Sequence, residues 1–205
     1  ITAVHAANAI TLTTDMGEIS VPKGYRSALN SSHASYWREA IARELRGLLE
    51  IGTWVMVPLS SIPPGSNIMR CHFVFTVKRN ADGTIEKFKA RLVADGNTQK
   101  HGVDFDRIFA TVIKASTLRL LLVLASLNDY DLHQIDIRQA FVQAELNEHL
   151  YMQPPPGVAA TDANGNRLVC KLRRSLYGLK QAGREWALLL TTFLLKWGFQ
   201  RSNID

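Results

Sequence analysis

The stretch covering residues 73–94 constrains the fold more than any other part of the chain. Two segments of strand-like composition, 73–78 and 84–94, are separated by the turn-forming run Asn80-Ala81-Asp82-Gly83, which predicts a β-hairpin. Because successive side chains of a strand point to opposite faces, Lys87, Lys89 and Arg91 are expected on one face of the second strand. The pattern therefore predicts antiparallel structure with a strongly cationic face.

Helical periodicity marks three other segments. The first helix is expected from Ser31 to a stop at Gly52. Its apolar residues recur at helical spacing and form a stripe of Trp37, Ile41, Leu45 and Leu48. The charged residues Glu39, Arg43 and Glu44 lie off this stripe. Residues 117–127, capped by Ser116, are apolar nearly all round, which predicts a helix buried in the core. A third helix is expected over 184–197, with an apolar stripe formed by Trp186, Leu190, Phe193, Leu194 and Trp197.

Further strands are predicted between these helices. Residues 53–58 and 168–172 have strand-like composition, and 130–136 alternates polar with apolar residues before a helical pattern over 138–145. The expected fold class is therefore α+β. Residues 1–22 are small, polar and aperiodic, and we expect a linker or upstream remnant there. The first residue is Ile1, from which we expect the chain to begin within a longer protein.

Composition narrows the class of protein. The 205 residues are 46% hydrophobic and 20% charged, as in a globular protein, and the longest apolar run, 120–127, is too short to cross a bilayer, so no membrane partner is expected. The net charge of +6 favours a polyanionic partner. Cys71 and Cys170 show neither metal-ligand spacing nor a disulfide framework, which predicts two structural thiols and a reducing compartment.

The basic residues concentrate in two clusters. One lies in the predicted hairpin (Lys78, Arg79, Lys87, Lys89 and Arg91), and the other lies between Ala163 and Ile204, where eight Lys and Arg residues face the single acid Glu185. Either cluster alone could be the solvated face of an ordinary element. Two clusters that flank one acidic strand end favour phosphate binding.

That acidic residue is Asp136, at the predicted junction of a strand and a helix. Such a carboxylate could hold a metal ion, and the first amides of the new helix, at Gln139 and Ala140, could contact phosphate oxygens. A helix cap is the alternative for an aspartate in this position. The octapeptide from Gln134 to Phe141 taken alone favours the helix cap.

Several segments in a fixed order resemble the reverse transcriptase domain of copia-type long-terminal-repeat retrotransposons. The resemblance covers residues 22–205 and is carried by Glu44, Gly52-Thr53-Trp54, Lys89-Ala90-Arg91-Leu92-Val93-Ala94, Gly96, Gln99, Gln134-Ile135-Asp136-Ile137, Ala140-Phe141, Tyr151-Met152-Gln153-Pro154 and Ser175-Leu176-Tyr177-Gly178-Leu179-Lys180-Gln181-Ala182. The resemblance implies a right-hand polymerase, with the hairpin in the fingers and an incomplete palm sheet. It also implies RNA-directed DNA polymerase activity in the intact parent.

The resemblance also implies roles for individual residues. Asp136 would be a catalytic carboxylate, and Asp136 and Ile137 would bind Mg²⁺ for two-metal nucleotidyl transfer. The expected nucleotide-binding residues are Arg79, Lys89, Arg91, Gln139, Ala140, Phe141, Tyr177 and Gly178; Phe141 would exclude a ribose 2′-hydroxyl, and Tyr177 and Gly178 would lie beneath the nucleotide and template base. The expected partners are an RNA or DNA template-primer, deoxynucleoside triphosphates and the rest of the Pol polyprotein. An intact parent would work in a cytoplasmic virus-like particle.

The chain also departs from the family pattern. Four residues differ from those usual in the family: Phe73 replaces Trp, Thr76 replaces Lys, and Thr111 and Gly183 each replace Pro. The sequence also lacks the Asp-Asp pair that, in the family, supplies the other two metal carboxylates. We therefore expect residues 23–205 to be a partial domain, truncated before that pair and inactive by itself because magnesium needs several converging oxygens. The alternatives are a non-catalytic nucleic-acid-binding remnant and a functionless decayed fragment.

Overall fold

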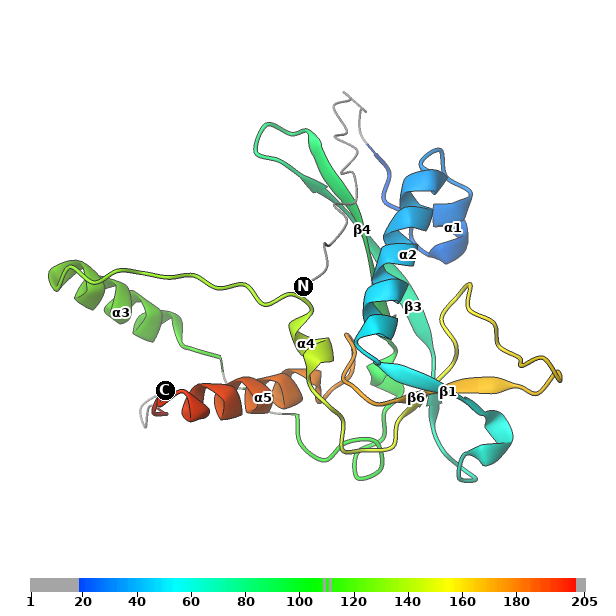
Figure 1. Cartoon of the computed structure of the whole chain (residues 1–205). Coiled ribbons are helices and arrows are strands. Elements are labelled where there is room, and N and C mark those ends of the chain that lie inside the picture. Colours follow the sequence, from blue (N-terminus) through cyan, green and yellow to red (C-terminus); the bar gives the residue numbers. More distant parts are fainter. Residues whose placement is uncertain (1–18, 109, 111, 202–205) are drawn as a thin grey trace, which may run out of the picture. The chain divides into compact units, whose positions relative to one another are not determined.

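The computed structural model describes residues 19–108, 110 and 112–201, which form helices and strands of an α+β fold. The chain divides into two compact units (Figure 1). The first holds the described residues up to Arg46 together with Phe73–Leu92, and the second holds Gly47–His72 and the described residues from Val93 onward. No described helix combines the length and the apolar character needed to span a bilayer.

The first unit is built on the predicted hairpin. Strands β3 (Cys71–Arg79) and β4 (Ile85–Ala94) form a two-stranded sheet, and helices α1 (Tyr25–Leu29) and α2 (Ala34–Glu50) precede it. The fully buried Trp37 of α2 contacts the rings of Phe75 and Phe88 edge-on, with centroids 5.1 and 4.7 Å away. The sequence pattern did not predict α1, whose Tyr25 stacks on Phe73.

The alternation predicted for β4 is confirmed. Phe88, Ala90 and Leu92 are buried, while Lys87 is exposed and Lys89 and Arg91 are half-buried on the opposite face. Glu44 lies off the apolar stripe of its helix, as the spacing indicates, and is nevertheless buried. Its Oε1 accepts the backbone N–H of Leu92 at 3.1 Å, so a hydrogen bond to the strand offsets the cost of burying the carboxylate.

The second unit contains a four-stranded sheet in the order β1-β6-β5-β2. Its strands are β1 (Trp54–Pro58), β2 (Ile68–Met69), β5 (Tyr151–Met152) and β6 (Leu168–Leu172). The β1–β6 and β5–β6 pairs are antiparallel and the β2–β5 pair is parallel. Two 3-10 turns, η1 (Leu59–Ser61) and η2 (Gly96–Thr98), belong to this unit. The strands predicted at 53–58 and 168–172 are confirmed.

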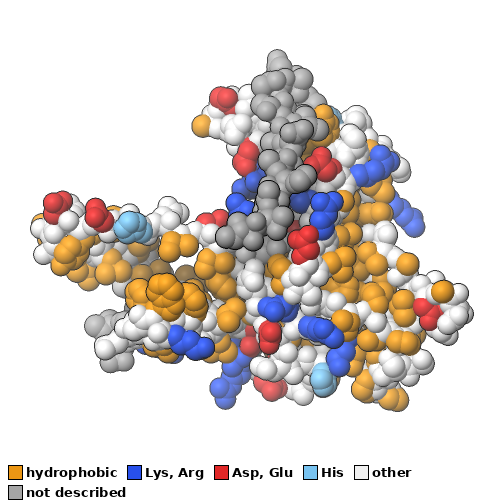
Figure 2. All heavy atoms as spheres, in the orientation of Figure 1, with side chains coloured by type: hydrophobic (Ala, Val, Ile, Leu, Met, Phe, Trp, Pro, Cys, Tyr) orange, Lys and Arg blue, Asp and Glu red, His pale blue; other side chains and the backbone are white. Residues whose placement is uncertain are grey.

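The prediction that residues 117–127 form a core helix is right about the helix and wrong about the core. Helix α3 spans Ala115–Leu127 and follows Lys114, with no side-chain cap from Ser116. Ala125 is its only buried residue, whereas Leu120 and Leu127 are 58% and 76% exposed. Apolar composition leads to burial only where other elements supply a covering surface, and the described residues supply one for Ala125 alone. Hydrophobic side chains consequently lie open on the surface over α3 (Figure 2).

Two further predictions near Asp136 are wrong. Residues 130–136 form no strand, because a strand needs a neighbour for its backbone hydrogen bonds and no described strand pairs with this segment. The helix predicted over 138–145 shrinks to α4 (Ala140–Gln143). Gln139 before it has a left-handed backbone (φ 51°) and Ala144 after it is extended, so neither can continue an α-helix.

The last helix, α5 (Ala182–Lys196), begins slightly before the predicted residue 184. Its predicted apolar stripe is only half-buried near the start and open near the end, where Phe193 and Trp197 are exposed. These two rings contact each other, with centroids 5.5 Å apart. Periodicity therefore located the helix but overstated the burial of its last turns.

Candidate functional site

Asp136 lies in the second unit, in the irregular segment between α3 and α4, and its side chain is exposed. Neighbouring Ile137 is 41% exposed. Within the described ranges, no three His, Cys, Asp or Glu side chains gather closely enough to hold a metal ion. Because Mg²⁺ requires several converging oxygens, the described residues do not by themselves fit a two-magnesium site.

Helix α4 presents Gln139, Ala140 and Phe141 directly after this segment. The side-chain amide of Gln139 lies against Gly47 of α2: a Cβ atom at Gly47 would come within 3.2 Å of Gln139 Nε2. A helix of four residues sums few peptide dipoles, so it offers little of the charge invoked for the predicted phosphate contact. The role of the Gln139 and Ala140 amides stays a prediction.

The structure brings together Phe141 and Tyr177, two of the predicted site residues. Their ring centroids are 5.7 Å apart with an interplanar angle of 67°, an edge-to-face contact. The backbones that carry these rings are joined, since Ser175 N–H donates to Ala144 O at 2.8 Å and Arg174 Nη1 donates to Gln143 O at 2.7 Å. The aromatic pair is thus held from both segments.

Tyr177 and Gly178 lie tightly against the end of β4. Ala94 N–H donates to Tyr177 O at 2.8 Å. Gly178 has φ +90°, and a Cβ atom there would lie 2.2 Å from Ala94 O; a Cβ at Gly96 would lie 2.1 Å from Gly178 O. Only glycine allows both approaches, because any Cβ would overlap a backbone oxygen. The family motif around Gly178 therefore has a steric cause in this chain.

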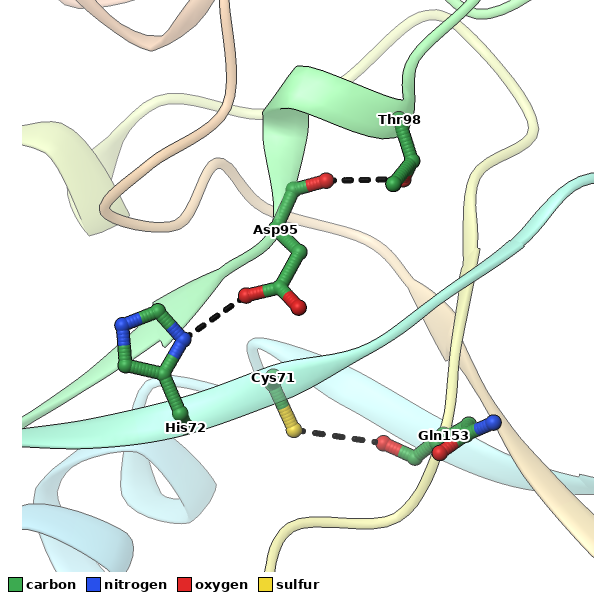
Figure 3. A network of polar contacts seen from close by, with 5 residues as sticks. All are labelled: Cys71, His72, Asp95, Thr98 and Gln153. Atoms are coloured by element: carbon green, nitrogen blue, oxygen red, sulfur yellow. Dashed lines mark hydrogen bonds and ion pairs between the residues drawn. The ribbon is translucent and has the colours of Figure 1, made fainter. Parts of the chain in front are cut away.

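The turn η2, which follows Asp95, is fixed by hydrogen bonds of its own (Figure 3). Asp95 N–H donates to Arg70 O at 2.9 Å, and Thr98 Oγ1 donates to Asp95 O at 2.7 Å. The Asp95 carboxylate also pairs with His72 Nδ1 at 2.7 Å. This network joins the start of β3 to η2 and so supports the loop at Gly178.

Cys71 lies in the same network, where its thiol donates to Gln153 O at 3.5 Å (Figure 3). Burial, and secondarily the negative charge of Asp95, raises the pKa of the Cys71 thiol to about 12. Burial likewise raises the pKa of Cys170 to about 12, with a smaller contribution from Cys71. Neither group supplies a thiolate nucleophile near neutral pH.

A buried amide network holds the other end of the Tyr177 loop. Gln99 Nε2 donates to Gln181 Oε1 at 2.9 Å, and Gln181 Nε2 donates to Asp104 O at 2.9 Å. Gln99 Oε1 accepts the backbone N–H of Lys180 at 2.8 Å. Gln99 and Gln181 both lie in segments that carry the family resemblance, but no sequence pattern predicted this network, because buried glutamines leave no periodic signal.

The predicted basic residues lie in the first unit. Lys89 lies close enough to Arg91 and Lys78 for them to affect its ionisation: burial lowers the pKa of Lys89, and repulsion from Arg91 and then Lys78 lowers it further, while Glu44 partly opposes this. Arg79 instead donates to Gly83 O at 2.8 Å within the hairpin turn. Lys89 and Arg91 thus belong to a cationic face, whereas Arg79 supports the turn.

Comparison with known proteins identifies the family to which the chain belongs. Residues 52–205 match the family model described as reverse transcriptase (RNA-dependent DNA polymerase), and the chain belongs to this reverse transcriptase family. Two similar proteins are the retrovirus-related Pol polyproteins from transposons RE2 and RE1 of Arabidopsis thaliana, 38% and 39% identical over 88% of the chain. The corresponding polyprotein from transposon TNT 1-94 of Nicotiana tabacum is 36% identical over 90% of it.

The copia-type resemblance is therefore confirmed. The chain spans only 12% to 14% of the length of these three relatives. No solved structure matches the chain.

Proposed function

We propose that residues 23–205 form part of the fingers and palm of an RNA-directed DNA polymerase, acting on an RNA or DNA template-primer within a longer Pol polyprotein. The observation that carries this proposal is the contact between Phe141 and Tyr177, whose two segments are joined by a backbone hydrogen bond and by a hydrogen bond from the Arg174 side chain. Aromatic rings offer bases a stacking surface that does not depend on sequence. In this proposal Tyr177 and Gly178 lie beneath the nascent base pair, and Phe141 lies beside the sugar of the incoming deoxynucleotide.

The cationic face of β4 would serve the phosphates. Lys89 and Arg91 project from the same face, and the crowding of positive charge around Lys89 costs free energy that a bound polyanion would relieve. Triphosphate oxygens and the template-primer backbone are such polyanions. Arg79, which is hydrogen-bonded to the hairpin turn, would reach phosphate only after giving up that contact.

Asp136, with the backbone of Ile137, would be one part of a magnesium site completed by carboxylates that the described residues do not bring together with it. When bound, magnesium would neutralise developing charge during nucleotidyl transfer. We therefore expect the 205-residue chain alone to give no primer extension with Mg²⁺ and deoxynucleotides. Extension by the wild-type chain that disappears in Asp136→Asn would disprove this expectation.

A non-catalytic role in nucleic-acid binding is the second candidate, favoured by the same cationic face. It predicts salt-sensitive binding of a template-primer duplex, because each neutralised phosphate releases counterions. Filter binding at two salt concentrations tests this with Lys87→Gln/Lys89→Gln, using exposed Lys23→Gln as the matched control. The double variant should reduce the salt slope by about two, as expected for two lost phosphate contacts. Absence of binding at low salt would reject both this candidate and the polymerase assignment of the face.

A further inference from the structure

The amide network beside the Tyr177 loop is the strongest feature that the proposed function leaves unused. Gln99 is 5% exposed and Gln181 is fully buried. Burying an amide is unfavourable unless its donors and acceptors are paired. Here the pairing runs in a chain: Gln99 donates to Gln181, and Gln181 donates to the backbone carbonyl of Asp104.

The network acts on the loop itself. Gln99 Oε1 accepts the N–H of Lys180, two residues after Gly178. Lys180 Nζ donates back to Gln99 O at 3.3 Å and lies 4.8 Å from the centre of the Phe105 ring, a cation–π contact. These contacts fix the C-terminal side of the loop, while the bond from Ala94 N–H fixes Tyr177.

The far end of the network is anchored as well. The Asp104 carboxylate accepts Asn67 Nδ2 at 2.7 Å and the N–H of Lys100 at 2.8 Å. The segment that accepts the hydrogen bonds of Lys180 and Gln181 is therefore itself anchored. Since each member of the chain is oriented by the next, loss of one amide should loosen Lys180 while leaving the surrounding sheet in place.

We propose that Gln99 and Gln181 are positioning residues, which hold the Tyr177–Gly178 loop so that the Tyr177 ring meets the base at the first unpaired template position. The proposal rests on the proposed function, because it takes the loop to lie beneath the nascent base pair. Neither glutamine contacts nucleic acid in this role. Both act through the backbone of residues 177–180.

The decisive variant is Gln181→Met, which nearly keeps the side-chain volume and removes both hydrogen bonds without burying a charge. Exposed Gln200→Met is the matched control. Hydrogen exchange of the full 205-residue chain, followed on peptides covering 174–183, should accelerate by about tenfold in Gln181→Met, as expected for loss of a buried hydrogen bond. The control should exchange like the wild type.

A second readout separates positioning from mere structural support. The probe is a template-primer with 2-aminopurine at the first unpaired template base and a fluorophore at the distant end of the duplex. Stacking on Tyr177 should quench 2-aminopurine in the wild type. In Gln181→Met we expect about half of the quenching to be lost while the Kd from fluorophore anisotropy changes by less than about twofold, because the phosphate contacts are untouched.

The variant Gln181→Glu, whose side chain has the same shape as glutamine, can restore the lost hydrogen bonds in a pH-dependent way. Its ionised carboxylate would face the Asp104 carbonyl, whereas the protonated acid can donate to that carbonyl as the amide does. Quenching relative to wild type should therefore recover as pH falls. Faster hydrogen exchange in Gln181→Met with unchanged quenching of 2-aminopurine would overturn the positioning role. Unchanged exchange in Gln181→Met would overturn the proposal outright, and a wild-type chain that binds no template-primer would instead refute the proposed function.

Discussion

At the scale of single residues, the close approach of Gly178 to the end of β4 is the most demanding feature. Gly178→Ala would place a Cβ atom 2.2 Å from Ala94 O at a backbone φ of +90°. The backbone cannot retreat without breaking the bond from Ala94 to Tyr177. We expect this variant to lower the free energy of unfolding by about 2 kcal/mol or more in urea titrations.

Gly165→Ala is the matched control in the same unit. Gly165 has a similar φ of +81°, but nothing lies within 4 Å of the added Cβ. Its cost should stay near 1 kcal/mol, the usual penalty for placing alanine in a left-handed conformation. Equal losses in the two variants would show that strain in φ, rather than the Ala94 contact, decides the effect.

The two thiols give a second prediction at this scale. Their pKa values are raised from 9.0 to about 12 in the folded chain, so at pH 8.5 the folded protein contains far less thiolate than the unfolded protein. Alkylation by iodoacetamide should be slower by about a hundredfold or more in the folded state, in proportion to the thiolate fraction. Mass spectrometry with and without urea measures this, and rapid labelling of native Cys71 would contradict the prediction.

At the scale of elements, Glu44 joins a helix to a sheet edge. Its carboxylate accepts Leu92 N–H and stabilises the charge of Lys89. Glu44→Leu should lower the free energy of unfolding by about 1–3 kcal/mol, because a buried N–H loses its acceptor. Exposed Glu39→Leu, which removes only an ion pair with Arg43, should cost less than about 1 kcal/mol. Urea unfolding followed by far-ultraviolet circular dichroism compares the free energies of the two variants.

Local sequence patterns predicted the helices and strands that form through interactions between residues close in sequence. The β3–β4 hairpin and α2 were predictable, because turn chemistry and helical periodicity act over a few residues. Burial was not: Glu44 and α3 depend on what distant segments cover. The contact of Phe141 with Tyr177 joins residues far apart in sequence. The family resemblance predicted both as nucleotide-binding residues but did not predict that their rings are in contact. The Gln99–Gln181 pair had no local signal at all, since glutamine is ordinarily a surface residue.

At the scale of the whole molecule, the open apolar surface of α3 and α5 should govern solution behaviour. Hydrophobic patches of this kind bind dyes and promote association. The double variant Leu120→Lys/Leu127→Lys should reduce 8-anilinonaphthalene-1-sulfonate fluorescence by about half. Its unfolding free energy should change by less than about 0.5 kcal/mol, because both side chains are already exposed.

Ala125→Lys supplies the contrast on the same helix. Ala125 is the buried residue of α3, so a lysine there should destabilise the protein by about 1–3 kcal/mol, as for other buried charges without a partner. If the double variant were the more damaging of the two, the leucine face of α3 would have to be packed in solution.

The pairing of β1 with β6 determines the order in which the strands can pair during translation. Trp54 lies opposite Leu172, so β1 leaves the ribosome many seconds before its partner strand exists, at ordinary elongation rates. The β3–β4 hairpin, by contrast, is complete as soon as residue 94 has emerged. We expect the nascent chain to acquire the hairpin first and to keep β1 unpaired until β6 arrives, which makes that apolar strand the natural target of chaperones during translation.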